Sequence, residues 1–503
     1  MDKILRVIVI VIIVILITVL ILSAWKRLRR HRSNGSRRGS HDRYSVNGPM
    51  VESHKKHKHQ ESKSSLDGSI QEMMDADPPN LNPCSGYVFV AKNFRNVRNA
   101  VHMFKASSTG TLTEVAGSPF NVSSSSGVGS GAGTPLAGDS LGAQSSLITD
   151  FTKNYLFVVN AGGNSVSSFK INSNSLTAVN TVSSGGDYPV SLATWGPFVY
   201  VVNGGLTSNI QGYIINYFNN GALVPLPGTN INLPAPNSHP LGTAGYPSNT
   251  QSPGQIIFSP SGKWLIIVAK ESIPLASDPP PGETTPGRIF IYKMVLGFPV
   301  GAPQIFTYPL ANCPPCAGGG FPRMPFSMVF SPNNQYALVP EIFGNDVSGN
   351  IGPGFMNSAM SSLSFNDNTG TFSIVTNSVP NGGEAICWVV VRDNGDVYTT
   401  QNFSDTVSRW HISSNGTLTL TQAVAATLGP GFATGGVFPT DLRLSCDQKN
   451  LYVLTTGAGN TGINNALVFV YKINSNGTLT EIQRKAVDAN AGPFLGQAGM
   501  TVI

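Results

Sequence analysis

Charged side chains follow two apolar segments of this sequence, where they could support acid–base chemistry. Lys270 and Glu271 come directly after "WLIIVA" (264–269), and Glu341 comes directly after "YALVP" (336–340). A carboxylate can act as a general base, and a lysine can stabilise a developing oxyanion. Each residue alone is more commonly a loop charge or a solvated ion pair, so their shared position at segment ends is what makes them candidates.

Two further charged residues precede apolar segments. Arg323 comes before "MPFSMVF", and Asp187 comes before "YPVSLA". A side chain at the start of such a segment can reach the same region as those above. His239 lies in a Pro- and Gly-rich stretch and has no visible partner.

Metal and redox motifs are weak in this chain. Cys313-Pro-Pro-Cys316 has the C-x-x-C form, but no second such pair completes a zinc site, and we interpret it as a loop with two incidental thiols. The 5 cysteines do not indicate a disulfide framework in a chain of 503 residues. The histidines of "SHKKHKHQ" lie among lysines, which repel cations. We therefore expect no metal and no cofactor.

The net charge of +6 is unevenly distributed. Residues 1–60 contain 13 Lys and Arg against 3 Asp and Glu, a net charge of +10, so the remainder carries −4. A nucleic-acid-binding domain normally has a basic face within the fold, and we expect no nucleic acid as a partner. "GAGNTG" (457–462) leads into a predicted strand and not a helix, which argues against a phosphate loop.

The N-terminus predicts a single-pass membrane anchor. Residues 7–24, "VIVIVIIVILITVLILSA", contain no charge and would span about 27 Å as a helix. A cleaved signal peptide is the alternative, but "WKRLRRHR" follows where small residues should precede cleavage. We predict an anchor at 1–25 and a basic, disordered linker at 26–83.

The basic residues after this segment predict its orientation. Lys26, Arg27, Arg29 and Arg30 would bind anionic lipids, and their excess favours a body on the cytosolic side. The N-x-S/T sites at Asn121, Asn402, Asn415 and Asn476 argue the other way. Two of them lie in Asn-Gly turns, which the backbone requires for its own reasons.

A four-strand unit recurs through residues 84–503. "ISSNGTLTLTQ" (412–422) and "INSNGTLTEIQ" (473–483) are nearly identical, and repeats of this kind indicate a repeated structural unit. Alternating apolar residues with Gly and Asn turns predict four antiparallel strands per unit. Seven copies of the second strand are recognisable, beginning at 87, 155, 198, 264, 336, 397 and 451, and the hairpin residue recurs as Gly110, Ser175, Gly221, Gly370, Gly416 and Gly477.

The two ends of this region complement each other. No first strand precedes Tyr87, whereas "GQAGMTVI" (496–503) is a spare strand after the last unit. Pairing them would close a ring and remove the open sheet edges. We therefore predict an all-β, seven-bladed β-propeller closed by the C-terminal strand. A solenoid would need capping repeats instead.

The repeats carry a family resemblance. "FSPSGKWLIIVAKES" (258–272), "FSPNNQYALVPEIF" (330–343) and "LFVVNAGGNSVSSFKI" (156–171) resemble the lactonase-like seven-bladed propellers, the family of propeller-type 6-phosphogluconolactonase and carboxymuconate cyclase. The resemblance covers roughly residues 84–503. Most propellers share this repeat pattern, so it specifies the fold better than the reaction.

The family implies a Glu, an Arg and a His-containing motif at the mouth of a central channel. Glu341 matches the Glu, as base or water-positioner; Asn402 stands where the Arg is expected, and "SPGQ" with Gln255 stands where the His motif is expected. Our candidate catalytic residues are Glu341, Asn402, Lys270 and Glu271, and our candidate substrate-binding residues are Arg323, Asp187, Gln255 and Gln401.

Two functions follow from these observations. The first is a membrane-anchored module that binds a protein or a glycan through its loop face, because long loops on rigid scaffolds often carry function and two family positions are unmatched. The second is a hydrolase or isomerase acting on a sugar-acid lactone, with Glu341 as base. The sequence favours the first narrowly.

Overall fold

The computed structural model divides the chain into two compact units, Met1–Ser65 and Leu66–Ile503. It describes residues 86–94, 97–127, 141–234, 252–270, 287–308, 323–344, 356–431, 436–456, 466–487 and 497–503, all within the second unit. The predicted anchor and the whole of the predicted linker lie outside these residues. Within the described ranges, no helix is long and apolar enough to cross a membrane.

The described strands form seven antiparallel sheets, which we number as blades in ring order. Blade 1 contains β5 (Leu147–Thr149), β6 (Tyr155–Asn160), β7 (Ser165–Asn172) and β8 (Ser175–Ser183). Blade 2 contains β9 (Pro189–Trp195), β10 (Phe198–Asn203), β11 (Asn209–Asn216) and β12 (Ala222–Pro225), with β13 (Ile231–Asn232) also paired to β11. Blade 3 contains β14 (Pro253–Phe258), β15 (Trp264–Ala269), β16 (Arg288–Val295) and β17 (Phe298–Thr307).

Blade 4 contains β18 (Arg323–Pro325), β19 (Val329–Phe330), β20 (Tyr336–Gly344), β21 (Met356–Asn366) and β22 (Thr371–Glu384). Blade 5 contains β23 (Ile386–Val391), β24 (Asp396–Gln401), β25 (Thr406–Ile412) and β26 (Leu418–Thr427). Blade 6 contains β27 (Pro439–Leu444), β28 (Asn450–Thr455), β29 (Ala466–Ile473) and β30 (Leu479–Val487). Blade 7 contains β31 (Met500–Val502), β1 (Tyr87–Ala91), β2 (Ala100–Ala106) and β3 (Leu112–Glu114), with β4 (Phe120–Asn121) beside β2. Two short 3₁₀ turns, η1 (Ala161–Gly163) and η2 (Tyr217–Asn219), complete the described elements.

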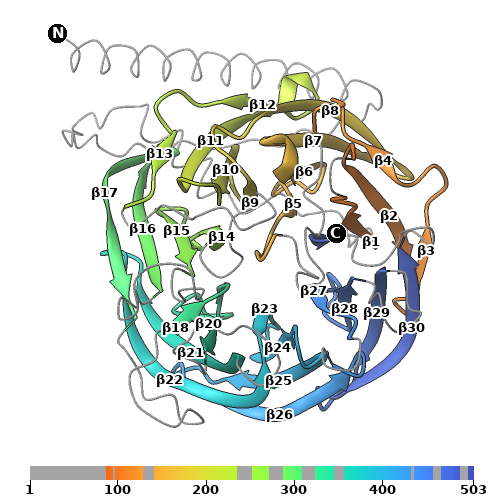
Figure 1. Ribbon diagram of the computed structural model, residues 1–503. Helices are drawn as coiled ribbons and strands as arrows, with labels where there is room; N and C mark the ends of the chain where they lie inside the picture. The colour runs from red at the N-terminus through yellow and green to blue at the C-terminus, as the bar shows by residue number, and fades with distance from the viewer. Residues whose placement is uncertain are drawn as a thin grey trace, which may run out of the picture. The chain divides into compact units, whose positions relative to one another are not determined.

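The blades form a closed ring (Figure 1). Each blade contacts the next: β5 with β9, β9 with β14, β15 with β18, β20 with β23, β23 with β27, β27 with β31, and β31 with β5. The C-terminal strand β31 pairs with β1, and Tyr87 and Ile503 exchange two backbone hydrogen bonds of 3.1 and 3.0 Å. The predicted seven-bladed propeller and its closure by the C-terminal strand are therefore confirmed.

A buried carboxylate also holds the closing strand. Asp441, in β27, accepts hydrogen bonds from the backbone N–H of Met500 at 2.8 Å and of Leu442 at 2.8 Å. Its other contact is an ion pair of 2.7 Å with Arg443. Burial raises the pKa of Asp441 to about 6, against the opposing attraction of Arg443. Blade 6 thus binds the strand that completes blade 7.

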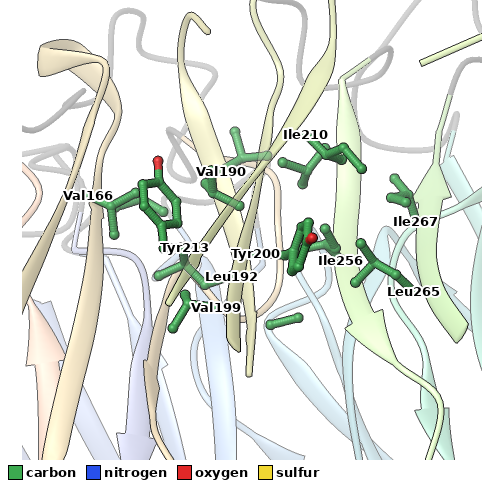
Figure 2. Packing of buried hydrophobic residues seen from close by; sticks show 14 of the residues in the cluster. Val166, Val190, Leu192, Val199, Tyr200, Ile210, Tyr213, Ile256, Leu265 and Ile267 are labelled. Atoms are coloured by element: carbon green, nitrogen blue, oxygen red, sulfur yellow. The ribbon is translucent and has the colours of Figure 1, made fainter. Parts of the chain in front are cut away.

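Apolar side chains fill the space between neighbouring blades. Figure 2 shows Val166 of blade 1 facing Tyr213 of blade 2, and Tyr200 of blade 2 beside Ile256 of blade 3; all four are almost fully buried. Burying one such side chain stabilises a fold by roughly 1.5–3 kcal/mol. The alternating strand pattern therefore supplies two apolar faces per blade, one for each neighbour.

The repeated hairpin glycine is an inter-blade contact. Gly416 has a φ of +84°, and a Cβ added there would lie 2.3 Å from Cε1 of Tyr336, the first residue of β20 in the preceding blade. The same relation joins Gly221 to Tyr155, Gly297 to Phe198 and Gly370 to Trp264. Only glycine combines this φ with this approach. Gly297, the hairpin glycine of blade 3, was not among the residues that we identified in the sequence.

Tyrosines reinforce the same contact. The third residue of the second strand is a tyrosine in three blades, and its hydroxyl donates to the carbonyl of the next blade's hairpin glycine. The pairs are Tyr200 with Gly297 at 2.8 Å, Tyr398 with Gly477 at 2.7 Å and Tyr452 with Gly110 at 3.2 Å. The near-identical turns of the sequence recur because each turn docks onto its neighbour.

Two features of the described residues were not predicted from the sequence. The inner strand of blade 4 consists of two short segments, β18 and β19, and between them Met328 N–H donates to the side chain of Gln255 in blade 3. Cys446 is disulfide-bonded, although the sequence indicated no disulfide framework. Cys387 is buried, and its Sγ donates to the carbonyl of Ala385 at 3.1 Å.

Candidate functional site

Four of the predicted residues lie at corresponding levels of blades 3, 4 and 5, although Glu341 lies within β20 and not at its end. Glu341 pairs with Pro325 in blade 4, and Gln401 pairs with Ile386 in blade 5. Lys270 and Asn402 each stand one residue beyond the equivalent position, after β15 and β24. All four are buried: three have an exposed fraction of 0% and Asn402 has 7%.

The carboxylate of Glu341 is directed toward the outer part of its blade. Its Oε2 accepts a 2.6 Å hydrogen bond from the hydroxyl of Ser378 on β22, which is the strand at the opposite edge of the sheet from β18. Ser378 is itself fixed by a 2.9 Å hydrogen bond from its N–H to Ser361. In this arrangement the carboxylate is engaged by protein, and its role as a base remains a prediction.

The two amides of blade 5 make structural contacts. Asn402 donates to the carbonyl of Pro439 in blade 6 at 2.8 Å. Gln401 donates to Thr399 at 3.0 Å and accepts from Thr406 at 2.9 Å, so both ends of its amide are bound within the blade. These contacts fix the orientation of both amides within the ring, although each amide keeps a second N–H donor and a further acceptor lone pair.

The remaining predicted residues do not form one cluster. Gln255 is buried and its Oε1 accepts from Met328 N–H at 2.6 Å, which joins blades 3 and 4. Asp187 is exposed in blade 2 and accepts a 2.8 Å hydrogen bond from Asn164. Arg323 begins β18, where its backbone pairs with Phe343. Glu271 lies outside the described residues.

A segment of the chain itself crosses the interior of the ring. This axial segment (residues 141–146) leads into β5 of blade 1, yet the amide of Gln144 exchanges two hydrogen bonds with the backbone of Val389 in blade 5, at 3.1 and 3.2 Å. Trp388 of the same blade donates its indole N–H to Ala143 at 3.3 Å. Blades 1 and 5 are not neighbours, so the segment must pass through the middle of the ring.

Blades 2 and 3 hold the axial segment from the other side. Ser191 donates to the carbonyl of Gln144 at 2.6 Å, and Gln144 N–H donates to Gly254 at 2.9 Å. The ammonium of Lys270 donates to the carbonyl of Gly142 and lies 4.9 Å from the ring centroid of Phe326. Lys270 therefore binds the axial segment at the level where the predicted catalytic residues lie.

The sequence offered no periodic signal for this segment. "LGAQSS" (141–146) is short and has no alternation, and its contacts with blade 5 join residues 245 positions apart. Its burial is nevertheless nearly complete, with exposed fractions of 0% for Leu141, 2% for Ala143 and 5% for Gln144. Both amide atoms of the buried Gln144 side chain are hydrogen-bonded to Val389, and this fixes the position of the axial segment relative to blade 5.

A pocket of about 310 Å³ lies between the first three blades. Trp195 and Phe258, the last residues of β9 and β14, form part of its wall, and Ser145 of the axial segment closes one side. Gln255, one of our candidate substrate-binding residues, also lines this pocket. Hydroxyl groups of Thr194 and Ser259 supply polar contacts, and none of its lining residues is ionisable. Such a lining suits a neutral ligand.

In the described part of the chain, no group of three or more His, Cys, Asp or Glu side chains could hold a metal ion.

One carboxylate–imidazole pair lies in the outer part of blade 7. His102 Nδ1, on β2, lies 2.8 Å from Glu114 Oε1, on β3. Burial alone would raise the pKa of Glu114, but hydrogen bonds from His102 and Ser118 outweigh burial and lower this pKa. This pair links two outer strands of blade 7.

Comparison with known proteins identifies the class. Residues 388–493 match the family described as "Lactonase, 7-bladed beta-propeller". With the seven blades of the structure, this match confirms the resemblance to lactonase-like propellers. No curated protein matches the chain.

Solved structures share the fold at low identity. A candidate 6-phosphogluconolactonase from Bacteroides fragilis is 16% identical with a TM-score of 0.55, and the match covers 85% of this chain and 100% of the other. A second from Bacteroides uniformis is 16% identical with a TM-score of 0.54, covering 83% and 99%. The periplasmic gluconolactonase of Pseudomonas aeruginosa is 13% identical with a TM-score of 0.51, covering 83% and 99%. At these identities the likeness concerns the fold alone.

Proposed function

We propose that this lactonase-like propeller is a binding module that engages a protein or glycan partner through the face of the ring at which Glu341 and Lys270 lie. The observation that supports this most strongly is the state of the predicted catalytic groups. Glu341 is bonded to Ser378, Asn402 to Pro439, and Lys270 to the axial segment. A hydrolase needs such groups free to contact water and substrate.

The axial segment adds a second argument for binding over hydrolysis. It passes through the ring at the level of Lys270, where a substrate carbonyl would have to approach an activated water. A rigid ring whose centre is filled by its own chain still presents its loop face to a partner, and loops on rigid scaffolds commonly carry recognition.

We also propose that residues 7–24 anchor the protein in a bilayer. A segment of 18 uncharged residues is long enough to span the hydrocarbon core. The test is carbonate extraction of membranes from cells that express the full chain. The protein should stay in the pellet, and replacement of Val14 and Leu16 by Asp should release it; a soluble wild-type protein would refute the anchor.

Binding is tested with charge reversals on opposite faces. Asp187 is exposed on the face where β9 begins, whereas Asp393 is exposed in the turn at the opposite ends of the strands. Proteins and glycans captured by the full-length chain should be lost with Asp187→Arg and retained with Asp393→Arg. Equal capture by both variants would contradict recognition through this face.

Lactone hydrolysis is the second candidate, because three structural neighbours are described as gluconolactonases or candidates for that activity. The full-length protein should be incubated with a panel of sugar-acid lactones, beside Glu341→Gln and Ser378→Ala. Turnover that disappears in Glu341→Gln and persists in Ser378→Ala would establish the hydrolase and overturn the binding proposal. We expect no turnover by any of the three.

A further inference from the structure

An exposed disulfide-bonded cysteine bears on the compartment in which the propeller lies. Cys446 follows β27, is exposed and is disulfide-bonded. Stable disulfides are rare in the cytosol, where thiols are kept reduced. This bond therefore points to an oxidising compartment.

The four N-x-S/T sites within the described residues differ in exposure, which gives a second and independent observation. Asn121, Asn415 and Asn476 are exposed. Asn402 has an exposed fraction of only 7%, and its amide nitrogen donates to Pro439 at 2.8 Å. In the folded protein, three of the four amide nitrogens could carry a large substituent and the fourth could not.

Two of the exposed sites lie at the outer hairpins of adjacent blades. The Oδ1 atoms of Asn415 and Asn476 accept 3.1 Å hydrogen bonds from Thr417 N–H and Thr478 N–H. The Thr478 hydroxyl also donates to Asn476 Oδ1 at 2.7 Å. These contacts use the amide oxygen and not the nitrogen, so a group attached to the nitrogen would leave the turn intact.

We infer that the propeller lies on the oxidising side of the membrane and carries N-linked oligosaccharides at Asn121, Asn415 and Asn476 but not at Asn402. In the modification, the asparagine nitrogen forms a bond to C1 of the first sugar. The bond from C1 to the diphosphate of a lipid-linked oligosaccharide breaks, the lipid diphosphate leaves with the electron pair, and the amide proton passes to a base of the transferase. No oxidant or reductant is required.

This orientation differs from the one that the basic residues after residue 24 favour. Positive charge biases insertion, whereas a disulfide records the compartment in which the body folded. The alternative to an anchor is a signal peptide at residues 1–24. Its cleavage, with transfer of the basic linker across the membrane, would place the propeller in the same oxidising compartment. The inference is independent of whether the ring binds a partner or hydrolyses a lactone.

The test uses the full chain expressed in eukaryotic cells that perform N-glycosylation. Purified protein is treated with peptide N-glycosidase in H₂¹⁸O, and peptides are analysed by mass spectrometry for conversion of Asn to labelled Asp. We expect conversion at 121, 415 and 476. Each of Asn121→Gln, Asn415→Gln and Asn476→Gln should remove one glycan from the intact mass, and Asn402→Gln should remove none.

A second measurement addresses the disulfide without any variant. Cells are treated with a membrane-permeant thiol-alkylating reagent before lysis, and the Cys446 peptide is mapped without reduction. The inference predicts an unalkylated, cross-linked Cys446. An alkylated Cys446 would overturn the location, an unmodified Asn121, Asn415 and Asn476 would overturn the glycosylation, and a glycan at Asn402 would overturn the exposure argument.

Discussion

Gly416→Ala should destabilise the propeller at a junction between two blades. Gly416 lies in the outer hairpin of blade 5 with a φ of +84°, and a Cβ would lie 2.3 Å from the ring of Tyr336 in blade 4. The carbonyl of Gly416 also accepts a 2.6 Å hydrogen bond from Ser362. The new methyl group can be accommodated only if the hairpin or the ring moves.

The magnitude has two contributions. A non-glycine residue in the left-handed region costs about 1–2 kcal/mol, and overpacking a close contact costs about 1–3 kcal/mol. Gly228 is the matched control, because its φ is +78° and no atom lies within 4 Å of the position that its Cβ would occupy. Gly228→Ala should therefore pay only the first cost, and the two variants should differ by about 1–3 kcal/mol.

The assay is equilibrium urea unfolding of the full-length protein followed by tryptophan fluorescence. A double-mutant cycle with Tyr336→Ala isolates the contact, because removal of the ring should abolish the extra cost of Gly416→Ala. If Gly416→Ala and Gly228→Ala destabilise equally, or if the cost persists without the Tyr336 ring, the hairpin glycines are not retained for docking between blades.

Three further predictions concern the ring. Tyr398→Phe removes the 2.7 Å hydrogen bond to Gly477 and should lower the free energy of unfolding by about 1 kcal/mol, as measured by urea denaturation. Asp441 has its pKa raised to about 6 by burial, so its contribution to stability is present below its unfolded pKa near 4 and is lost as the pH rises through 6. The stability of wild type relative to Asp441→Asn should fall by about 3 kcal/mol between pH 4 and pH 7, and a pH-independent difference would contradict the shift. Deletion of residues 500–503 opens the ring and should lower the melting temperature far more than Tyr398→Phe does, and equal melting would argue against closure.

The fold was predictable because its signals are local and repeated. Segments such as "FVYVVN" (198–203) and "LYVLTT" (451–456) alternate between two buried faces, and glycine turns separate them. The spare strand at 496–503 defined closure without any long-range information. Seven copies of one pattern compensate for the ambiguity of each copy.

The site was less predictable because it depends on side-chain direction and distant contacts. Glu341 was expected directly after a strand that ends at Pro340, whereas β20 continues to Gly344. Nothing local indicated that its carboxylate binds Ser378 on β22. Lys270 was placed correctly at a strand end, yet its partner Gly142 belongs to a segment with no periodic pattern. Contacts between residues more than 100 positions apart leave no trace in local composition.

Occupation of the ring's centre by the axial segment is tested most directly by hydrogen exchange at Val389, whose N–H donates to Gln144 Oε1 at 3.1 Å. Gln144→Leu keeps the side chain's size and removes both side-chain hydrogen bonds to Val389. Mass spectrometry should show faster exchange in a peptide covering 386–391 and unchanged exchange in one covering 451–455. Unchanged exchange at 386–391 would mean that the axial segment does not cross the ring to blade 5, and the channel would then be open to a substrate.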